Sequence, residues 1–305
     1  MSKQPTYKLG LIISLAAAAC TTTKMAPSGD AHTDHITTSS SSGVSAALAA
    51  TDTSSTVPAD AAGAAARLSA SSRHGEWAMI RTGDGDSVKA WVVYPERSTK
   101  APVVLVVHEI FGLSTWVRGV ADQLAADGFI AIAPDLLTMK NLPGGPDSLV
   151  ARVATDSIRT LNPVWIQKQL DAVARYGMSL PAAQKKYGIV GFCWGGGVSF
   201  AHAVHAPGLG ASVVYYGPSP MTSDLASVRA PVLGLYAGSD ARVDATIPAA
   251  DTALHALGRT YTYNIYPGAG HGFLRNQTGM NGANMTATRA AWPATIAWFK
   301  KYLGS

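Results

Sequence analysis

Cysteine is scarce in this chain, which has Cys20 and Cys193 and no other among its 305 residues. No CxxC pair and no Cys/His cluster has the spacing of a zinc site, so we expect neither a metal nor an organic cofactor. His202 and His205 share a helical face, but no further ligand lies in register with them. We interpret these two histidines as packing or surface residues.

Aromatic residues are missing from a long stretch near the N-terminus. None occurs from Thr21 to Ala66, and all seven tryptophans lie at or beyond Trp77. Ser, Thr, Ala and Gly dominate this part instead, and such a segment cannot bury enough apolar surface to offset the entropy lost on folding. We therefore predict a disordered tether over residues 20–73 and one folded domain over residues 74–305.

Charged residues are also few, at 14% of the chain, and the net charge is only +5. The Lys and Arg residues are scattered rather than gathered into a basic patch with aromatic residues between them. This distribution argues against a nucleic-acid partner. The hydrophobic content of 47% is sufficient for a core.

The apolar segment 9–19 is too short to cross a bilayer, which takes about 20 residues. It follows Lys3 and Lys8 and ends in three alanines, which predicts an export signal over residues 1–19. Cys20 comes next, as in a bacterial lipoprotein signal, although Ala17 stands where leucine is usual. Lipidation of Cys20 with membrane attachment and ordinary signal-peptidase cleavage both stay open, and either outcome predicts an exported protein, periplasmic or lipid-anchored.

Short apolar strands alternate with helical patterns throughout the predicted domain. The first two strands flank Asp84-Gly85, a turn signal that predicts a β-hairpin. The alternation predicts a mostly parallel sheet with helices on both faces, and functional residues in the loops after the strands. The expected strands cover residues 77–81, 88–94, 103–107, 129–133, 187–190, 211–215, 231–236 and 260–266, and the expected helices cover 114–127, 163–178, 198–206, 244–257 and 284–303.

The turn Gly191-Phe192-Cys193-Trp194-Gly195 joins a predicted strand to a predicted helix. Strand, sharp turn and helix are the setting of a nucleophile elbow, in which the residues two places either side of the nucleophile must be small. Cys193 is therefore the candidate nucleophile, and the helix N-terminus beside it favours a thiolate. The alternative is a buried structural cysteine among loop glycines. Neither N-terminal outcome gives this cysteine a disulfide partner, so it can persist as a thiol after export.

A thiol nucleophile needs a base and an acid that orients the base. In the α/β-hydrolase arrangement the acid and then the histidine follow the nucleophile, each in a loop after a strand. Asp240 follows the strand that ends at Tyr236, and His271 follows the strand that ends at Tyr266. Asp244 is an alternative acid, but it begins a helical pattern and we interpret it as a helix N-cap.

Glu109 lies just after the predicted strand 103–107, in the loop that normally lends a backbone N–H to an oxyanion hole. We expect the N–H groups of Ile110 and Trp194 to form that hole and to stabilise a tetrahedral intermediate. A carboxylate beside the hole repels an oxyanion. Glu109 must therefore be paired, hydrogen-bonded to the thiol or in control of the thiol's charge, unless it is a solvated loop residue.

In content and order these motifs resemble the dienelactone hydrolase family, over nearly the whole predicted domain. The resemblance implies an α/β-hydrolase fold and a catalytic triad of Cys193, His271 and Asp240. It also implies that Glu109 contacts the resting thiol until substrate displaces that contact, and that Arg275 pairs with Glu109 or with a substrate carboxylate. The matching segments are His108-Glu109-Ile110-Phe111-Gly112, Gly191-Phe192-Cys193-Trp194-Gly195-Gly196, Gly238-Ser239-Asp240 and Gly270-His271-Gly272-Phe273.

One segment departs from the family's pattern. The prototype has a tyrosine and a second substrate-binding arginine at the places where this chain has Leu137 and Met139. Lys140 beside them could supply a point charge but not a bidentate carboxylate clamp. The resemblance therefore supports the hydrolase class and not dienelactone itself as the substrate.

We expect an exported hydrolase that cleaves a small-molecule lactone or carboxylic ester through an acyl-Cys193 intermediate. A hypothesis from another class is a non-catalytic surface lipoprotein that uses the same fold to bind a ligand or partner. That hypothesis predicts an eroded triad, whereas Cys193, Asp240 and His271 are all present. The sequence does not predict an oligomeric state.

Overall fold

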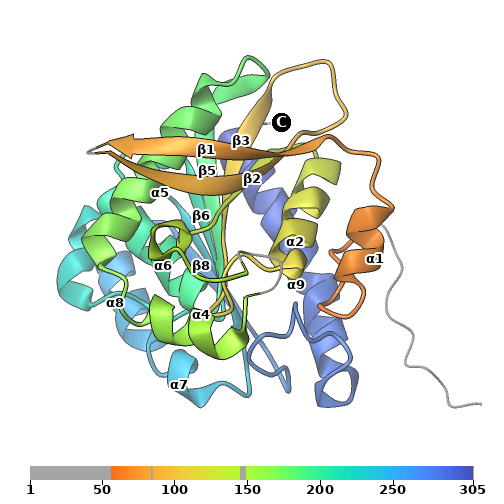
Figure 1. Ribbon diagram of the computed structural model, residues 1–305. Helices are drawn as coiled ribbons and strands as arrows, with labels where there is room; N and C mark the ends of the chain where they lie inside the picture. The colour runs from red at the N-terminus through yellow and green to blue at the C-terminus, as the bar shows by residue number, and fades with distance from the viewer. Residues whose placement is uncertain (1–55, 84, 145–148, 305) are drawn as a thin grey trace, which may run out of the picture. The chain divides into compact units, whose positions relative to one another are not determined.

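The computed structural model describes residues 56–83, 85–144 and 149–304 (Figure 1). The predicted export signal over residues 1–19, Cys20, the tether up to residue 55 and Asp84 lie outside the described residues. None of the helices in the described part is both long and apolar enough to cross a membrane.

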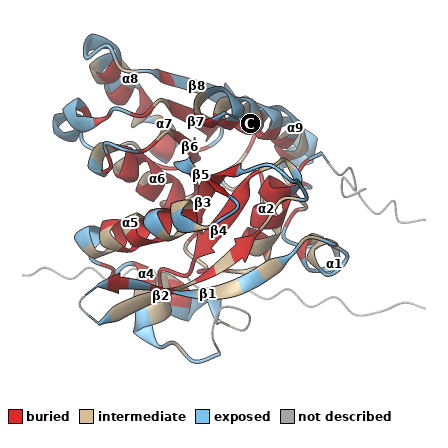
Figure 2. Cartoon of the chain, turned by 90° about the horizontal axis from the view of Figure 1, so that it is seen from above, coloured by how far each residue is buried: buried red, intermediate tan, exposed pale blue. Residues whose placement is uncertain are grey.

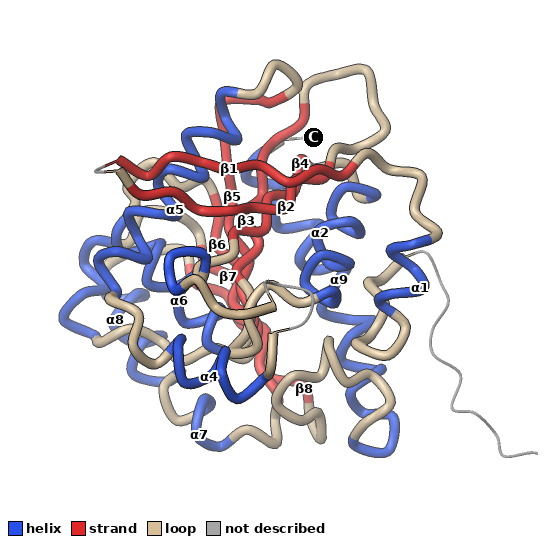
Figure 3. Tube along the Cα trace, viewed as in Figure 1, coloured by secondary structure: helices blue, strands red, loops and turns tan. Residues whose placement is uncertain are grey.

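One sheet organises the described part, with strand order β1-β2-β4-β3-β5-β6-β7-β8. The hairpin β1–β2 is antiparallel, β2 pairs antiparallel with β4, and the pairs from β4 to β8 are all parallel. Figure 3 shows the hairpin crossing the view while the central strands run vertically, as expected for a twisted sheet. The strands are β1 Gly75–Gly83, β2 Asp86–Val93, β3 Ala101–Val107, β4 Ile130–Pro134, β5 Ala183–Phe192, β6 Ala211–Tyr215, β7 Val232–Ala237 and β8 Tyr261–Tyr266.

Helices cover both faces of this sheet, and the central strands are buried between them (Figure 2). Strand β3 shows the two sides by alternation. Val103 and Leu105 belong to the core cluster that also contains residues of α5, α6 and α8, whereas Val104 and Val106 belong to the cluster that contains residues of α2 and α9. The mostly parallel α/β-hydrolase fold that the sequence predicts is therefore confirmed. The helices are α1 Ala64–Ser69, α2 Thr115–Ala126, α4 Ala151–Ile158, α5 Pro163–Ser179, α6 Trp194–His205, α7 Ala241–Asp244, α8 Ile247–Ala256 and α9 Ala283–Leu303, with short 3-10 turns at Thr138–Lys140, Thr222–Ser227 and Met280–Gly282.

Several helices differ from the sequence prediction, in addition to α1, which lies in the segment predicted to be a tether. Helix α6 begins at Trp194, directly after Cys193, and α4 was not predicted at all. The prediction that Asp244 caps the next helix is wrong, because Asp244 ends α7 and a new helix starts at Ile247. Pro248 lies in the first turn of this new helix, where its missing N–H and fixed φ favour a helix start.

Residues 56–73 belong to the same compact unit as the rest of the domain. Val57 is 2% exposed, and the Trp116 indole Nε1–H donates to the carbonyl oxygen of Ala59 at 3.2 Å. Arg73 makes two hydrogen bonds to the buried carboxylate of Asp122. The predicted tether is therefore wrong for residues 56–73. Amino-acid composition indicates only how much side-chain surface a segment can bury. This segment is also held by hydrogen bonds to its backbone carbonyl groups.

Removal of this N-terminal segment should destabilise the domain. A chain that starts at residue 74 loses the burial of Val57 and leaves Asp122 without Arg73. We expect its free energy of unfolding to fall by about 2 kcal/mol or more relative to a chain that starts at residue 56. Thermal unfolding measures the difference, and equal melting temperatures for the two chains would contradict the assignment of these residues to the domain.

Candidate active site

Cys193 lies alone between the last residue of β5 and the first residue of α6. Its backbone has a positive φ of 58°, with ψ of −118°, a combination that residues other than glycine rarely adopt. A Cβ atom at Gly191 would overlap the carbonyl oxygen of Gly195, and one at Gly195 would overlap the carbonyl oxygen of His108. The structure thus contains the strand, sharp turn and helix predicted from the sequence, and both glycines are required by the close approach of backbones.

His271 and Asp240 come from loops after neighbouring strands. Asp240 follows β7 and His271 follows β8, and the His271 Nδ1 lies 2.5 Å from Asp240 Oδ2. Because the carboxylate oxygen accepts the Nδ1 proton, the Nε2 of His271 is available to accept a proton from another group. The edge of the His271 ring also packs against Tyr216, with 5.1 Å between ring centroids.

The loop that carries His271 is tied to the start of α9. Asn284, which is 1% exposed, accepts a hydrogen bond from the Gly270 N–H at 2.8 Å and donates to the Asn276 carbonyl at 2.6 Å. One buried amide therefore fixes the loop on both sides of the histidine. Sequence reasoning missed Asn284, whose only signal was its place at the start of the last predicted helix.

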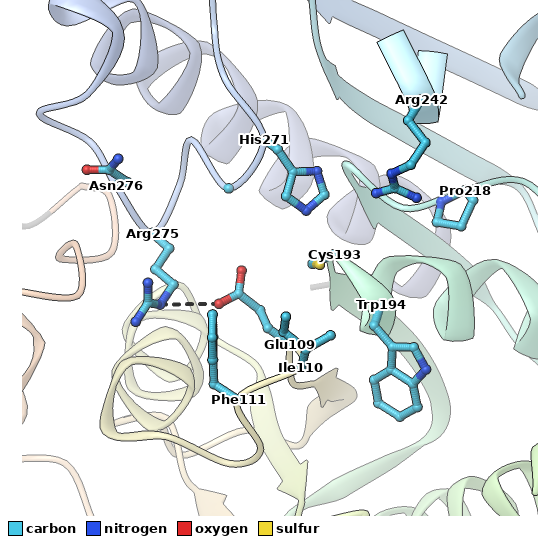
Figure 4. A pocket seen from close by; sticks show the side chains of 11 residues that line it. Glu109, Ile110, Phe111, Cys193, Trp194, Pro218, Arg242, His271, Arg275 and Asn276 are labelled. Carbon is cyan, nitrogen blue, oxygen red and sulfur yellow. Dashed lines mark ion pairs between the residues drawn. The ribbon is translucent and has the colours of Figure 1, made fainter. Parts of the chain in front are cut away.

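A cavity of about 560 Å³ opens beside Cys193 (Figure 4). It brings together most of the predicted site residues, with Asp240 hydrogen-bonded to His271 at its edge. Leu137, Met139 and Lys140 are not among its lining residues, and the Lys140 ammonium donates to Thr160 instead. The lining residues are Glu109, Ile110, Phe111, Cys193, Trp194, Pro218, Arg242, His271, Gly272, Arg275 and Asn276.

Glu109 is a buried carboxyl group with a cationic partner. Its side chain is 5% exposed, and its Oε2 forms an ion pair with the Arg275 Nε at 3.3 Å, drawn as a dashed line in Figure 4. The Arg275 guanidinium also lies 4.7 Å from the centre of the Phe111 ring. Burial raises the pKa of Glu109 to about 7, although the charge of Arg275 opposes this rise. Near neutral pH both the protonated and the ionised form of Glu109 are therefore populated.

The thiol of Cys193 is held in its neutral form. Burial and the nearby charge of Glu109 raise its pKa to about 11, against the opposing effects of a hydrogen bond from the Trp194 N–H and the charge of Arg242. The expectation that the helix N-terminus favours a thiolate is thus outweighed in the resting site by burial. An uncharged thiol is a weak nucleophile, so the site needs a base to activate it.

Two further features of the site had no clear sequence signal. Arg242 lies two residues after Asp240, in the short helix α7, and lines the cavity; it is exposed and belongs to no motif. The Ala61 N–H, in the N-terminal segment, donates to the carbonyl oxygen of Arg275 at 2.9 Å, and the buried Gln277 amide donates to Pro58. The loop that carries Arg275 is therefore held by a segment that the sequence analysis placed outside the domain.

The histidines on α6 are structural, as the sequence predicts. His202 is buried between Gln167 and Tyr187, and burial lowers its pKa to about 4. His205 pairs with Asp171 at 2.9 Å near the surface. Across the described ranges no group of three or more His, Cys, Asp or Glu side chains could hold a metal ion.

Comparison with known proteins places this chain in a family. The sequence profile of the dienelactone hydrolase family matches residues 88–303. A Salmonella typhi protein named "Putative carboxymethylenebutenolidase" is 31% identical over 72% of this chain and 85% of its own length, and an Escherichia coli protein of the same name is 30% identical over 72% and 84%.

Solved structures agree with this assignment. The crystal structure titled "Putative Dienelactone Hydrolase" from Klebsiella pneumoniae has a TM-score of 0.67 and 27% identity, and the match covers 76% of this chain and all of that one. A dienelactone hydrolase from Anabaena variabilis, at 24% identity and a TM-score of 0.59, shares the fold. The chain therefore belongs to the dienelactone hydrolase family and is a carboxylic-ester or lactone hydrolase.

Proposed function

We propose that this protein hydrolyses a small lactone or carboxylic ester through a covalent acyl-Cys193 intermediate. One observation carries the proposal: Cys193 stands on a sharp turn at a cavity that His271 also lines, and His271 is hydrogen-bonded to Asp240. Nucleophile, base and orienting acid come from the loops after β5, β8 and β7. This is the arrangement that nucleophilic acyl transfer requires.

In the proposed acylation step, the Nε2 of His271 accepts the thiol proton and the sulfur attacks the substrate carbonyl carbon. Asp240 stabilises the imidazolium that forms. The carbonyl oxygen becomes an oxyanion that accepts hydrogen bonds from the N–H groups of Ile110 and Trp194. When the intermediate collapses, the C–O bond to the leaving group breaks and His271 returns the proton to the leaving alkoxide.

Deacylation repeats the same steps with water as the nucleophile. His271 accepts a proton from the water while the water oxygen adds to the thioester carbon and the carbonyl oxygen becomes an oxyanion. When this intermediate collapses, the C–S bond breaks, His271 returns the proton to the Cys193 sulfur and the carboxylic acid is released. A lactone releases no separate alcohol in the first step, because its alkoxide stays attached to the acyl group. Each proton transfer uses a group of this chain.

Glu109 is proposed to control the charge of the thiol. Burial is the main cause of the raised pKa of Cys193, and an ionised Glu109 raises it further, so the resting enzyme keeps an unreactive thiol. In this structure Glu109 pairs with Arg275. A substrate that enters the cavity and moves the Glu109 carboxylate further from Cys193 weakens its charge effect and favours the thiolate. Because Leu137, Met139 and Lys140 do not line the cavity, the prototype's second carboxylate clamp has no counterpart there.

The proposal also includes export. It is supported by the sequence of residues 1–19, by the alanines before Cys20 and by the lack of aromatic residues from Thr21 to Ala66. Lipidation at Cys20 would hold the enzyme at a membrane surface, whereas ordinary cleavage would release it.

Asp240 and Asp244 provide a matched pair of carboxylates for testing the proposed triad. We expect Asp240→Asn to lower kcat/KM for an activated aryl ester by about 100-fold or more, because the amide cannot stabilise the imidazolium. Asp244→Asn should stay within about threefold of the unmodified enzyme, since its carboxyl does not contact His271. Steady-state ester hydrolysis measures both variants. Equal losses, or a larger loss from Asp244→Asn, would refute the assignment of Asp240.

The proposed role of Glu109 predicts a lower thiol pKa in Glu109→Gln. The substitution removes a negative charge that disfavours the thiolate, so the midpoint of the pH profile for alkylation by iodoacetamide should fall below that of the unmodified enzyme, whose thiol pKa is about 11. Glu76→Gln, which removes an exposed carboxylate from β1, serves as the control and should leave the midpoint unchanged. An unchanged or higher midpoint in Glu109→Gln would exclude charge control by this residue.

A further inference from the structure

His108 is a fully buried histidine directly before Glu109. Its Nε2 lies 3.3 Å from the backbone nitrogen of Leu136, and its Nδ1 lies 2.8 Å from the carbonyl oxygen of Glu109. A backbone N–H can only donate, so Nε2 must be the unprotonated acceptor. The proton of the neutral ring is then on Nδ1, which donates to the Glu109 carbonyl. Burial lowers the pKa of His108, which favours this neutral form.

The Glu109 carbonyl and the Ile110 N–H belong to one peptide unit. Because that unit is planar and trans, its C=O and N–H bonds point in opposite directions, and fixing one fixes the other. The Gly112 N–H donates to the same carbonyl oxygen at 3.3 Å, so two donors hold it. Ile110, on the other side of this peptide, lines the catalytic cavity.

The same imidazole also contacts the second proposed donor residue. The His108 ring stacks on the indole of Trp194, with 5.5 Å between centroids and 24° between planes. The backbone N–H groups of Ile110 and Trp194 come from elements far apart in the sequence. His108 is a buried side chain that touches the first peptide through a hydrogen bond and the second residue through its ring.

We propose that His108 is a positioning residue for the oxyanion hole: its Nδ1–H holds the Glu109–Ile110 peptide so that the Ile110 N–H faces the cavity. This inference rests on the proposed function, in which Ile110 and Trp194 bind the oxyanion. His108 touches no reacting atom. Its effect passes through the orientation of one peptide bond, and it should therefore change oxyanion binding without changing the thiol.

Two substitutions separate the two hydrogen bonds of the imidazole. His108→Asn keeps an N–H donor at the δ position, where it can replace Nδ1, and loses the group that accepts from Leu136. His108→Gln places its amide at the ε position, where its oxygen can accept from Leu136, and loses the donor to Glu109. The proposal predicts that the Asn variant keeps the function of the hole and the Gln variant loses it.

Three measurements on the full enzyme distinguish an effect on the reactivity of the thiol from an effect on the oxyanion hole. The first is kcat/KM for an activated aryl ester. The second is inhibition by a small aldehyde: the Cys193 sulfur bonds to its carbonyl carbon, the carbonyl π electrons become the oxyanion and the thiol proton passes to His271 or to that oxygen. The third is alkylation by iodoacetamide, in which sulfur displaces iodide and no oxyanion forms. Only the first two need the hole.

We expect His108→Gln to lose about 10- to 100-fold in kcat/KM and a similar factor in aldehyde affinity, less than the loss from deleting a donor outright. Its alkylation rate should stay within about twofold of the unmodified enzyme. His108→Asn should stay within about threefold in all three measurements. Thermal unfolding of both variants checks that they are folded at the assay temperature.

The proposal would be overturned if the Gln and Asn variants had equal kcat/KM and equal aldehyde affinity. It would also be overturned if His108→Gln lowered the alkylation rate by the same factor as the other two quantities. If His108→Gln does not fold, His108→Leu, which also lacks the donor to Glu109, replaces it in the comparison with His108→Asn, with the same expected loss and the same overturning result. If the unmodified enzyme binds the aldehyde but does not hydrolyse the ester, the proposed function is refuted. The role of His108 in the oxyanion hole is then tested by the aldehyde affinities of the variants alone. No aldehyde adduct at all would refute both.

Discussion

The close approach of the Gly191 and Gly195 backbones is the constraint on which the site depends. A side chain at either position would overlap a backbone carbonyl, so the chain can make this turn only with two glycines. The turn holds Cys193 at a φ of 58°, which costs a non-glycine residue roughly 1–3 kcal/mol and persists because the surrounding structure enforces it. Strand β5 lies between β3 and β6 in the middle of the sheet, so the loops after neighbouring strands converge on the sulfur.

Burial at this turn then sets the charge state of the site. It raises the pKa of both Glu109 and Cys193, and their mutual repulsion favours keeping at least one of them protonated. Arg275 pairs with the carboxylate, and Arg242 lines the cavity as a second cation. In the proposed mechanism this balance keeps the thiol unreactive until substrate enters. The N-terminal segment contributes as well, since Ala61 hydrogen-bonds to the backbone of Arg275.

Local patterns explain what the sequence could predict. The continuous apolar strands predicted the fold, which is confirmed. The glycines around Cys193 and the order of Asp240 and His271 predicted a catalytic site. The catalytic roles of these residues stay predictions. Other features depend on contacts between distant segments and have no local pattern. The packing of residues 56–73, the role of Asn284 and the neutral thiol all follow from which groups are buried together. Asp244 was misplaced because a helical pattern does not reveal a break between two short helices.

Intact mass spectrometry can establish whether Cys193 forms the proposed covalent acyl intermediate. The enzyme is mixed briefly with an activated ester, quenched in acid and compared with Cys193→Ala, and the modified peptide is then sequenced. We predict a transient mass increase of one acyl group, located on Cys193 and absent from the variant. An adduct on another residue, or ester turnover that persists in Cys193→Ala, would exclude Cys193 as the nucleophile.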